Sequence, residues 1–241
     1  MNMETPFLYG RIAENENFTN RRNETEFLKK NFKGLINTVI ISPRRWGKTS
    51  LVHKVAKLIS EEEKNVIICQ VDIFNCRTEE EFYTVFANSL LKSTTTVWEE
   101  FVGGVKKYLG RLAPIVSISD ATQTYELSFG IDFKDSRLSY DEILDLPQVI
   151  ANDTKKRIVV CIDEFQNINE YEEPLAFQRK LRSHWQKHTS VCYCLYGSKR
   201  HMLLNIFNNY SMPFYKFGDI LFLSKIEHAE WVTFISERFA D

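Results

Sequence analysis

The sequence has 241 residues, of which 44% are hydrophobic and 26% are charged, as in an ordinary globular protein. Its 31 Lys and Arg residues nearly balance its 32 Asp and Glu residues, so no overall positive field marks it as a nucleic-acid-binding protein. No stretch approaches the ~18 uncharged apolar residues of a membrane span, and the N-terminus lacks the pattern of a signal peptide. We therefore expect a soluble cytoplasmic protein whose five cysteines are free thiols, most of them packed in apolar strands.

Five nearly continuous apolar runs predict strands that are buried on both faces, as in a parallel sheet covered by helices. They are Thr38–Ser42, Asn65–Asp72, Arg157–Asp163, Val191–Gly197 and Asp219–Leu223. Helical periodicity appears between them, in Ser50–Glu63, Glu79–Leu91, Leu175–His188 and Lys199–Asn208. Strands that alternate with helices predict a doubly wound α/β domain.

The segment from about Thr94 to Pro147 interrupts this alternation. Within it, Ile115–Ser119 and Thr124–Ile131 alternate apolar and polar residues, which is typical of half-exposed antiparallel strands. We interpret the segment as an inserted β-hairpin at the edge of the sheet.

The stretch that joins the first strand to the first helix has the pattern of a phosphate-binding loop. Its residues are Ser42, Pro43, Arg44, Arg45, Trp46, Gly47, Lys48, Thr49 and Ser50. In a P-loop, backbone N–H groups and the helix dipole hold the phosphates. We expect Lys48 to contact the β- and γ-phosphates of ATP, and the Thr49 hydroxyl to bind Mg²⁺. The alternative is a capped helix start that carries an exposed lysine.

Two adjacent carboxylates, Asp163 and Glu164, directly follow the third apolar run. Ligands of open α/β sheets bind at the carboxyl ends of the strands. Asp163 is therefore predicted to hold Mg²⁺ together with Thr49, and Glu164 to polarise the water that attacks the γ-phosphate. Either acid alone is also typical of the start of a solvated loop.

At these residues the chain resembles the archaeal-type ATPases of the STAND branch of AAA+-related P-loop proteins. The resembling segments extend along most of the chain and are the entry motif Phe18–Glu24, the P-loop Ser42–Leu51, the Walker B ending Asp163–Gln166 and the fourth strand Leu195–Ser198. The P-loop of that family often lacks its leading glycine, so Ser42 is in keeping with it.

The resemblance also implies roles for single residues. Phe18 and Arg21 of the entry motif would lie beside the nucleotide, and Ser198 would occupy the sensor-1 position. Lys216 stands where the family usually has an arginine, and lysine lacks the planar fork of an arginine finger. Arg200, just after the sensor position, is the alternative residue for stabilising charge; the expected catalytic set is thus Glu164, Lys48, Ser198 and Arg200.

By resemblance the fold is an α/β P-loop NTPase of the ASCE type, with five parallel strands in the order 5-1-4-3-2. Residues 1–224 would form the ATPase domain, with an insertion at about 94–147, and residues 225–241 would begin a helical lid. Members of the family usually continue into a complete lid and a winged-helix domain. The chain stops at Asp241, which implies a truncated or short variant with slow turnover.

Two further groups of residues allow a second interpretation. His184 and His188 could share a metal ion, but nothing in the pattern supplies a third ligand, so surface histidines are favoured. Six basic residues could form a strip that binds nucleic acid, although no aromatic ladder accompanies them. They are Arg179, Lys180, Arg182, Lys199, Arg200 and His201.

The sequence therefore predicts an ATP-binding, Mg²⁺-dependent ATPase that acts as a nucleotide-controlled switch in signalling or regulation. A protein partner, or self-association through the lid or a further C-terminal region, would read the switch. The alternatives are an AAA+-like loader or motor that acts on DNA, and a nucleotide-binding module with little turnover.

Overall fold

The fold was analysed in a computed structural model that describes residues 11–94, 115–118, 125–128 and 139–239. Five parallel strands form the central sheet in the order β2-β5-β6-β1-β7, which is the predicted order read from the other edge. The strands are β1 (Thr38–Ile41), β2 (Val66–Asp72), β5 (Arg157–Asp163), β6 (Val191–Gly197) and β7 (Asp219–Phe222). The predicted α/β sheet of a P-loop NTPase is thereby confirmed.

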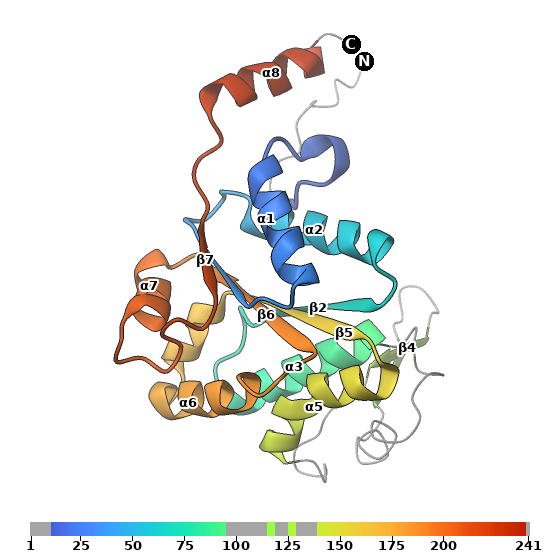
Figure 1. The fold of residues 1–241 in the computed structure, drawn as a ribbon, viewed down its shortest axis with the longest axis vertical. Coiled ribbons are helices and arrows are strands. Elements are labelled where there is room, and N and C mark those ends of the chain that lie inside the picture. Colours follow the sequence, from blue (N-terminus) through green and yellow to red (C-terminus); the bar gives the residue numbers. More distant parts are fainter. Residues whose placement is uncertain (1–10, 95–114, 119–124, 129–138, 240–241) are drawn as a thin grey trace.

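Helices cover both faces of this sheet (Figure 1). One face packs on α1 (Arg22–Lys33) and α2 (Lys48–Glu62), through a core that includes Leu28, Phe32 and Val55. The other face packs on α3 (Glu79–Thr94), α5 (Tyr140–Thr154), α6 (Pro174–Trp185) and α7 (Arg200–Asn208). The three-layer arrangement explains the continuous apolar runs of the inner strands β5, β6 and β1, which are buried from above and below, whereas the edge strands β2 and β7 are partly exposed.

The second face is filled mainly by aromatic side chains. Trp185 of α6 stacks on Tyr193 of β6 with ring centroids 4.1 Å apart, and Phe82 of α3 packs edge-on against Phe177 at 5.1 Å. Such contacts hold α3 and α6 firmly against the sheet.

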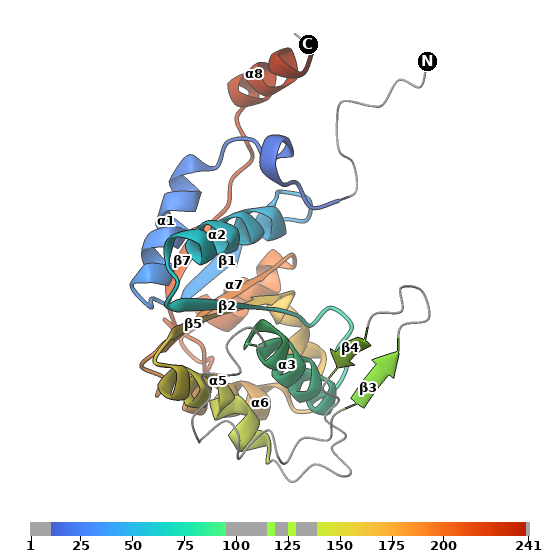
Figure 2. The same ribbon diagram turned by 90° about the vertical axis from the view of Figure 1, so that its right-hand side faces the viewer.

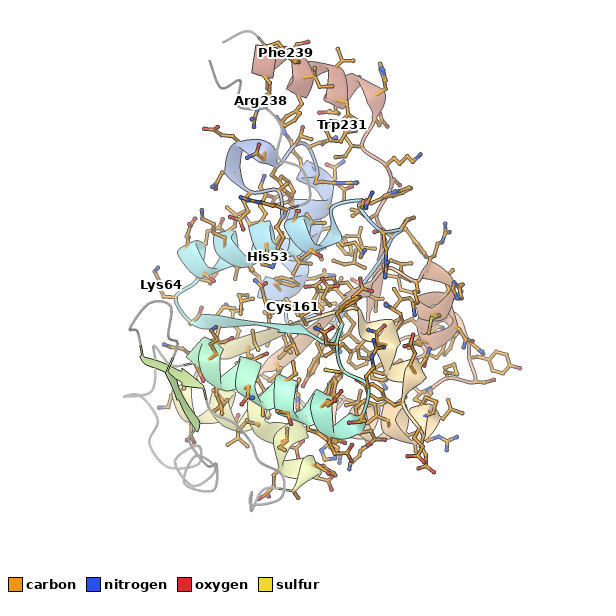
Figure 3. All side chains as sticks on the ribbon, turned by 180° about the vertical axis from the view of Figure 1, so that it is seen from behind. His53, Lys64, Cys161, Trp231, Arg238 and Phe239 are labelled. Atoms are coloured by element: carbon orange, nitrogen blue, oxygen red, sulfur yellow. The ribbon has the colours of Figure 1, made fainter. Side chains whose placement is uncertain are left out.

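The cysteines belong to the core, as predicted. Cys69, Cys161, Cys192 and Cys194 are fully buried in the central strands and free of disulfides, and Cys76 is a fifth buried thiol. Figure 3 shows Cys161 in the interior, between the helical layers. Burial raises the pKa of the Cys69 and Cys192 thiols, which keeps them protonated and unreactive.

Helix α5 was not predicted. Pro147 lies within it. Proline is uncommon inside a helix because it removes one backbone hydrogen bond, so its presence in the sequence is a signal against a helix. Its start nevertheless carries a recognisable signal, because Ser139 and Glu142 form a capping box in which each side chain accepts a hydrogen bond from the other's backbone N–H. The helix therefore spans Pro147, at which the inserted segment was expected to end.

The predicted hairpin strands are present as β3 (Ile115–Ile118) and β4 (Tyr125–Ser128), which pair antiparallel. They form a two-stranded sheet of their own and do not extend the central sheet (Figure 2). The other residues of this segment, 95–114, 119–124 and 129–138, lie outside the described part of the chain.

Helix α8 (His228–Phe239) stands apart from the three layers, beyond the layer of α1 and α2 (Figures 1 and 2). None of its residues is buried. Arg238 joins it to the N-terminal segment by donating to the Glu16 carbonyl at 2.7 Å and to the Asn17 side chain at 3.1 Å. None of the helices in the described part of the chain has both the length and the apolar character that a membrane span requires.

The two histidines of the α6 region were expected on the surface, and this was wrong for His188, whose side chain is only 3% exposed. His184 and His188 both contact Asp145 of α5, at 2.8 Å and 3.3 Å, and His188 also contacts the Tyr193 hydroxyl at 2.8 Å. Burial lowers the pKa of His188. Through Asp145, the two histidines therefore connect α5 to α6 and to the residues that follow it.

Candidate nucleotide-binding site

The predicted phosphate loop joins the end of β1 to the start of α2. Gly47 is the residue before the helix and has φ +83°, a conformation that glycine adopts at little cost. Arg45 also has a positive φ, of 64°, so the loop turns sharply at two nearby points. Gly47 has no side chain that could cap α2, and the first N–H groups of the helix are therefore available to a phosphate.

Lys48, the first residue of α2, is almost completely buried behind this loop. The residue is 6% exposed, and its Nζ lies 3.5 Å from the Pro43 carbonyl oxygen. Burial lowers the pKa of Lys48, while the nearby carboxylates of Glu164 and Asp163 act in the opposite direction. A phosphate would supply the negative charge that this buried ammonium lacks.

The next residue connects the two predicted motifs. The Thr49 hydroxyl donates a hydrogen bond of 2.8 Å to Oδ2 of Asp163, at the end of β5. A hydroxyl and a carboxylate that converge in this way are oxygen donors of the kind that Mg²⁺ prefers. The residues present therefore fit the metal that the P-loop fold implies, with Thr49 and Asp163 as its protein ligands.

Asp163 is charged at some cost to the fold. Burial raises its pKa from 3.8 to about 6, although the bonds from Thr49 and from the Glu164 N–H act against the shift. Because the folded-state pKa lies above the unfolded one, the ionised carboxylate destabilises the ligand-free protein above pH 6, and this penalty disappears as the pH falls through 6 towards 3.8.

Asp163→Asn is therefore expected to raise the melting temperature of the ligand-free protein at pH 8, because the amide can keep the Thr49 hydrogen bond without the buried charge. A gain on the order of 1–3 kcal/mol corresponds to a shift of roughly 2–12 °C. The difference should shrink at pH 5, where wild-type Asp163 is mostly protonated. Thermal unfolding at both pH values measures it, and a variant that melts below wild type at pH 8 would contradict the assigned cost.

Glu164 follows Asp163 in a left-handed conformation, with φ 53°, that is uncommon for a residue with a side chain. Its N–H donates to Asp163 Oδ1 at 2.7 Å, which holds the turn. Its Oε2 accepts hydrogen bonds from the Ser198 hydroxyl at 2.8 Å and from the Ser198 N–H at 3.3 Å. Arg44 of the phosphate loop in turn donates from Nε to the Ser198 hydroxyl oxygen at 3.3 Å.

The structure thus brings most of the predicted site residues together at the carboxyl ends of β1, β5 and β6. Two hydrogen-bonded links cross the site, one directly from Thr49 to Asp163 and one from Arg44 through Ser198 to Glu164. Sequence separation gives no hint of these distances, since Arg44 and Ser198 are 154 positions apart. The strand order accounts for them, because β6 lies between β1 and β5.

A cavity of about 950 Å³ opens beside the phosphate loop, a size suited to a nucleotide. It lies between the N-terminal segment, the loop and the approach to α8, and its lining includes Phe18, Arg45, Ser50, Lys225 and Trp231. Figure 3 labels Trp231 at the start of α8.

The two entry-motif residues line this cavity in different ways. Phe18 presents its ring to the Lys54 ammonium at 4.1 Å. Arg21 is 5% exposed, and its Nη2 donates to the carbonyl oxygens of Trp46 at 3.1 Å and Ser224 at 2.6 Å. The structure therefore makes Arg21 a brace between the phosphate loop and the segment after β7, in addition to its place in the cavity wall.

Arg200 does not join the hydrogen-bonded groups around Glu164 in the described structure. Its guanidinium lies over the Phe222 ring at 5.9 Å, and it lines a second cavity of about 420 Å³ together with Pro43 and Lys225. Several other members of the predicted basic strip are also engaged: Lys180 pairs with Asp141 at 3.5 Å, Arg182 lies over the Phe217 ring and Lys199 pairs with Glu170.

Sequence reasoning missed Gln166. Its Nε2 donates to Glu164 Oε2 at 2.5 Å, so it belongs to the same group of contacts as Ser198. The only signal in the sequence was its place two residues after Glu164, at the end of the Walker B motif; its burial is seen only in the structure.

A protein family and several solved structures match this chain. The family described as predicted AAA-ATPase matches residues 22–204. No curated protein matches the chain in sequence.

Solved structures show the same fold at low sequence identity. A Walker-type ATPase of Pyrococcus abyssi is 16% identical over 98% of this chain, with a TM-score of 0.64. The ORC2 protein of Aeropyrum pernix, solved in ADPNP-ADP complexes, is 17% identical over 98%, with a TM-score of 0.62. The ORC1 protein of A. pernix, in complex with DNA, is 10% identical over 94%, with a TM-score of 0.59.

The chain spans 62%, 55% and 50% of the lengths of these three proteins. Since the matched family covers most of the chain and both motifs meet at one site, the chain belongs to the predicted AAA-ATPase family.

Proposed function

We propose that this chain binds ATP with Mg²⁺ and hydrolyses it, and that the bound nucleotide controls a switch. The observation that carries the proposal is the pair of links across the site, Thr49 to Asp163 and Arg44 through Ser198 to Glu164. They connect the phosphate loop to Asp163 directly and to the candidate base Glu164 through Ser198. This is the arrangement that γ-phosphate hydrolysis requires.

In this proposal each side chain has a distinct task. Lys48 and the first N–H groups of α2 bind the β- and γ-phosphates, and Thr49 and Asp163 hold the metal. When bound, Mg²⁺ supplies positive charge to the phosphate oxygens. Glu164 accepts a proton from the attacking water, and Ser198 keeps its carboxylate in place. The cavity lined by Phe18 and Trp231 receives the base and ribose.

The switch would act through α8, as the start of a helical lid in residues 225–241. Trp231 lines the nucleotide cavity, while the helix buries none of its own residues. A ligand in the cavity could therefore move α8 at little cost in packing. Exposed apolar side chains on the same helix, Val232, Ile235 and Phe239, support a protein partner or self-association there.

Hydrogen exchange of α8 in three states tests the switch. With Glu164→Gln, used to keep ATP intact, the amides of α8 should exchange more slowly with ATP than with ADP or without nucleotide. The amides of α5, on the far side of the sheet, should be unaffected and serve as the internal control. If the amides of α8 exchange at the same rate in all three states, bound nucleotide does not act on α8 and the proposed switch is wrong.

Two finer assignments accompany the proposal. Membership of the STAND branch of archaeal-type ATPases is supported by the entry motif, in which Arg21 braces the phosphate loop, and by a P-loop without a leading glycine. A cytoplasmic location is supported by five free cysteines, which suit a reducing compartment.

An ATPase that acts on DNA is the second candidate, because ORC1, which shares this fold, was solved in complex with DNA. Against it, Lys180, Arg182 and Lys199 already contact Asp141, Phe217 and Glu170. Hydrolysis that DNA stimulates, and that added salt suppresses, would select this alternative.

A further inference from the structure

Gln166 is a buried amide at the back of the candidate active site. It lies in the short helical turn η3 (Phe165–Glu170) that follows β5, and only 1% of it is exposed. Its Nε2 donates to Glu164 Oε2 at 2.5 Å and to the Asn167 side-chain oxygen at 3.2 Å. Asn167 is itself tied to the carbonyl oxygens of Ile73 and Phe74, so the amide is anchored to the segment after β2.

The end of β6 leaves room for this amide. A Cβ atom at Gly197 would lie 1.8 Å from Gln166 Oε1 and 3.0 Å from its Cδ, which no real structure tolerates. The same Cβ would be 3.4 Å from the Glu164 Cα, an ordinary contact. A side chain at position 197 would therefore displace the Gln166 amide from its present place, and the next residue is Ser198, which also binds Glu164.

The hydrogen bonds on Glu164 are unequally shared between its two oxygens. Oε2 accepts from Gln166 Nε2, from the Ser198 hydroxyl and from the Ser198 N–H. In the described ranges Oε1 accepts no hydrogen bond. A carboxylate held by one oxygen from two sides has a fixed orientation, and the other oxygen remains free to accept a proton.

We infer that Gln166 is a positioning residue, which together with Ser198 holds Glu164 by its Oε2 atom. The Oε1 atom of Glu164 is then left to take the proton of the attacking water. Gly197 provides the space that the Gln166 side chain occupies. This inference rests on the proposed role of Glu164 as the base. It assigns no contact between Gln166 and ATP, so the predicted effect is on the chemical step and not on nucleotide affinity.

The chain offers a matched control in Gln178 of α6. Gln178 is 0% exposed, its Nε2 makes one hydrogen bond, of 2.7 Å to Asn169, and its Oε1 has no partner among the described residues, as is also true of Gln166. Replacing either glutamine by leucine removes a buried amide of the same size. Within the described part of the chain, Gln178 makes no hydrogen bond to a residue of the candidate site, so a loss of stability alone would affect both variants alike.

The first measurement compares Gln166→Leu and Gln178→Leu with wild type in single-turnover hydrolysis and in ATP affinity. Gln166→Leu should hydrolyse bound ATP about 10- to 100-fold more slowly, as expected when a reacting group loses its fixed orientation. Its affinity for ATP should stay within about twofold of wild type, and Gln178→Leu should keep the wild-type rate. Equal rates for the two variants would overturn the inference.

The second measurement is a double-mutant cycle with Gly197→Ala and Gln166→Ala. Gly197→Ala alone should slow hydrolysis by a similar factor, because its methyl group displaces the Gln166 amide. In the Gln166→Ala background the same change should cost less than about twofold, since the clash is gone. Equal costs in both backgrounds would show that Gly197 acts independently of Gln166.

Glu164→Gln separates the failure of this inference from that of the proposed function. If Glu164→Gln hydrolyses ATP at the wild-type rate, the proposed base is wrong. If Glu164→Gln is slow while Gln166→Leu matches wild type, only the positioning role of Gln166 is lost.

Discussion

Lys48→Ala is expected to abolish measurable ATP binding. The Lys48 ammonium lies behind the phosphate loop, 6% exposed, and burial lowers its pKa. A buried cation of this kind gains most from a phosphate, because the ligand replaces the water that the fold has removed. Losing a charged hydrogen bond costs about 1.5–3 kcal/mol, or about 10- to 150-fold in affinity, and the lost Coulomb attraction adds to it.

Titration calorimetry of ATP with wild type and Lys48→Ala measures the effect. Lys57→Ala is the control: Lys57 lies on the same helix but is exposed, and its Nζ contacts only the Asn15 side chain among the described residues, at 3.3 Å. It should bind ATP as wild type does. If Lys48→Ala binds ATP with wild-type affinity, the assignment of this loop as the phosphate-binding loop is wrong.

Glu164→Gln is expected to slow hydrolysis by a factor on the order of 10²–10⁴ while ATP affinity barely changes. The amide has the same shape and can still accept the Ser198 hydrogen bonds through its oxygen, but it cannot take a proton from water. The variant should therefore accumulate with ATP bound. Asp163→Asn should behave differently, because Asp163 is placed with Thr49 and its loss should weaken Mg²⁺-dependent binding itself.

The two variants should differ in ATP affinity: Asp163→Asn should lose Mg²⁺-dependent affinity, and Glu164→Gln should not. ATP affinity is determined with and without Mg²⁺ for wild type, Glu164→Gln and Asp163→Asn. Equal losses of affinity in both variants would mean that the adjacent carboxylates share one role. No residue would then be identified as the catalytic base.

The sheet could be predicted from sequence because its three inner strands, β5, β6 and β1, are buried almost throughout and appear as apolar runs. The edge strands β2 and β7 are partly exposed but keep enough apolar residues to show the same signal. Arg157–Asp163 and Val191–Gly197 are predicted with the bounds that the structure has. The phosphate loop was equally recognisable, since its chemistry depends on adjacent residues. Helix α5 was missed because Pro147 breaks its pattern, although the capping box at Ser139 marks its start.

What the sequence could not reveal were contacts made by tertiary packing. Arg21 was expected beside the nucleotide, but its second role as a brace depends on Ser224, 203 positions away. His188 was expected at the surface, and only the packing of α5 on α6 buries it beside Asp145. The Gln166 side chain fits where it does because Gly197, on the neighbouring strand β6, has no side chain. A single sequence cannot show that these two residues are in contact.

The central claim is that this site hydrolyses ATP through Glu164. The most direct measurement is single-turnover hydrolysis, in which wild type and Glu164→Gln are each loaded with ATP and then given either Mg²⁺ or a chelator. Wild type is expected to convert its bound ATP to ADP only with Mg²⁺, and Glu164→Gln is expected to retain ATP under both conditions. A wild-type protein that binds ATP and leaves it intact, or a Glu164→Gln variant that hydrolyses it at the wild-type rate, would contradict the claim.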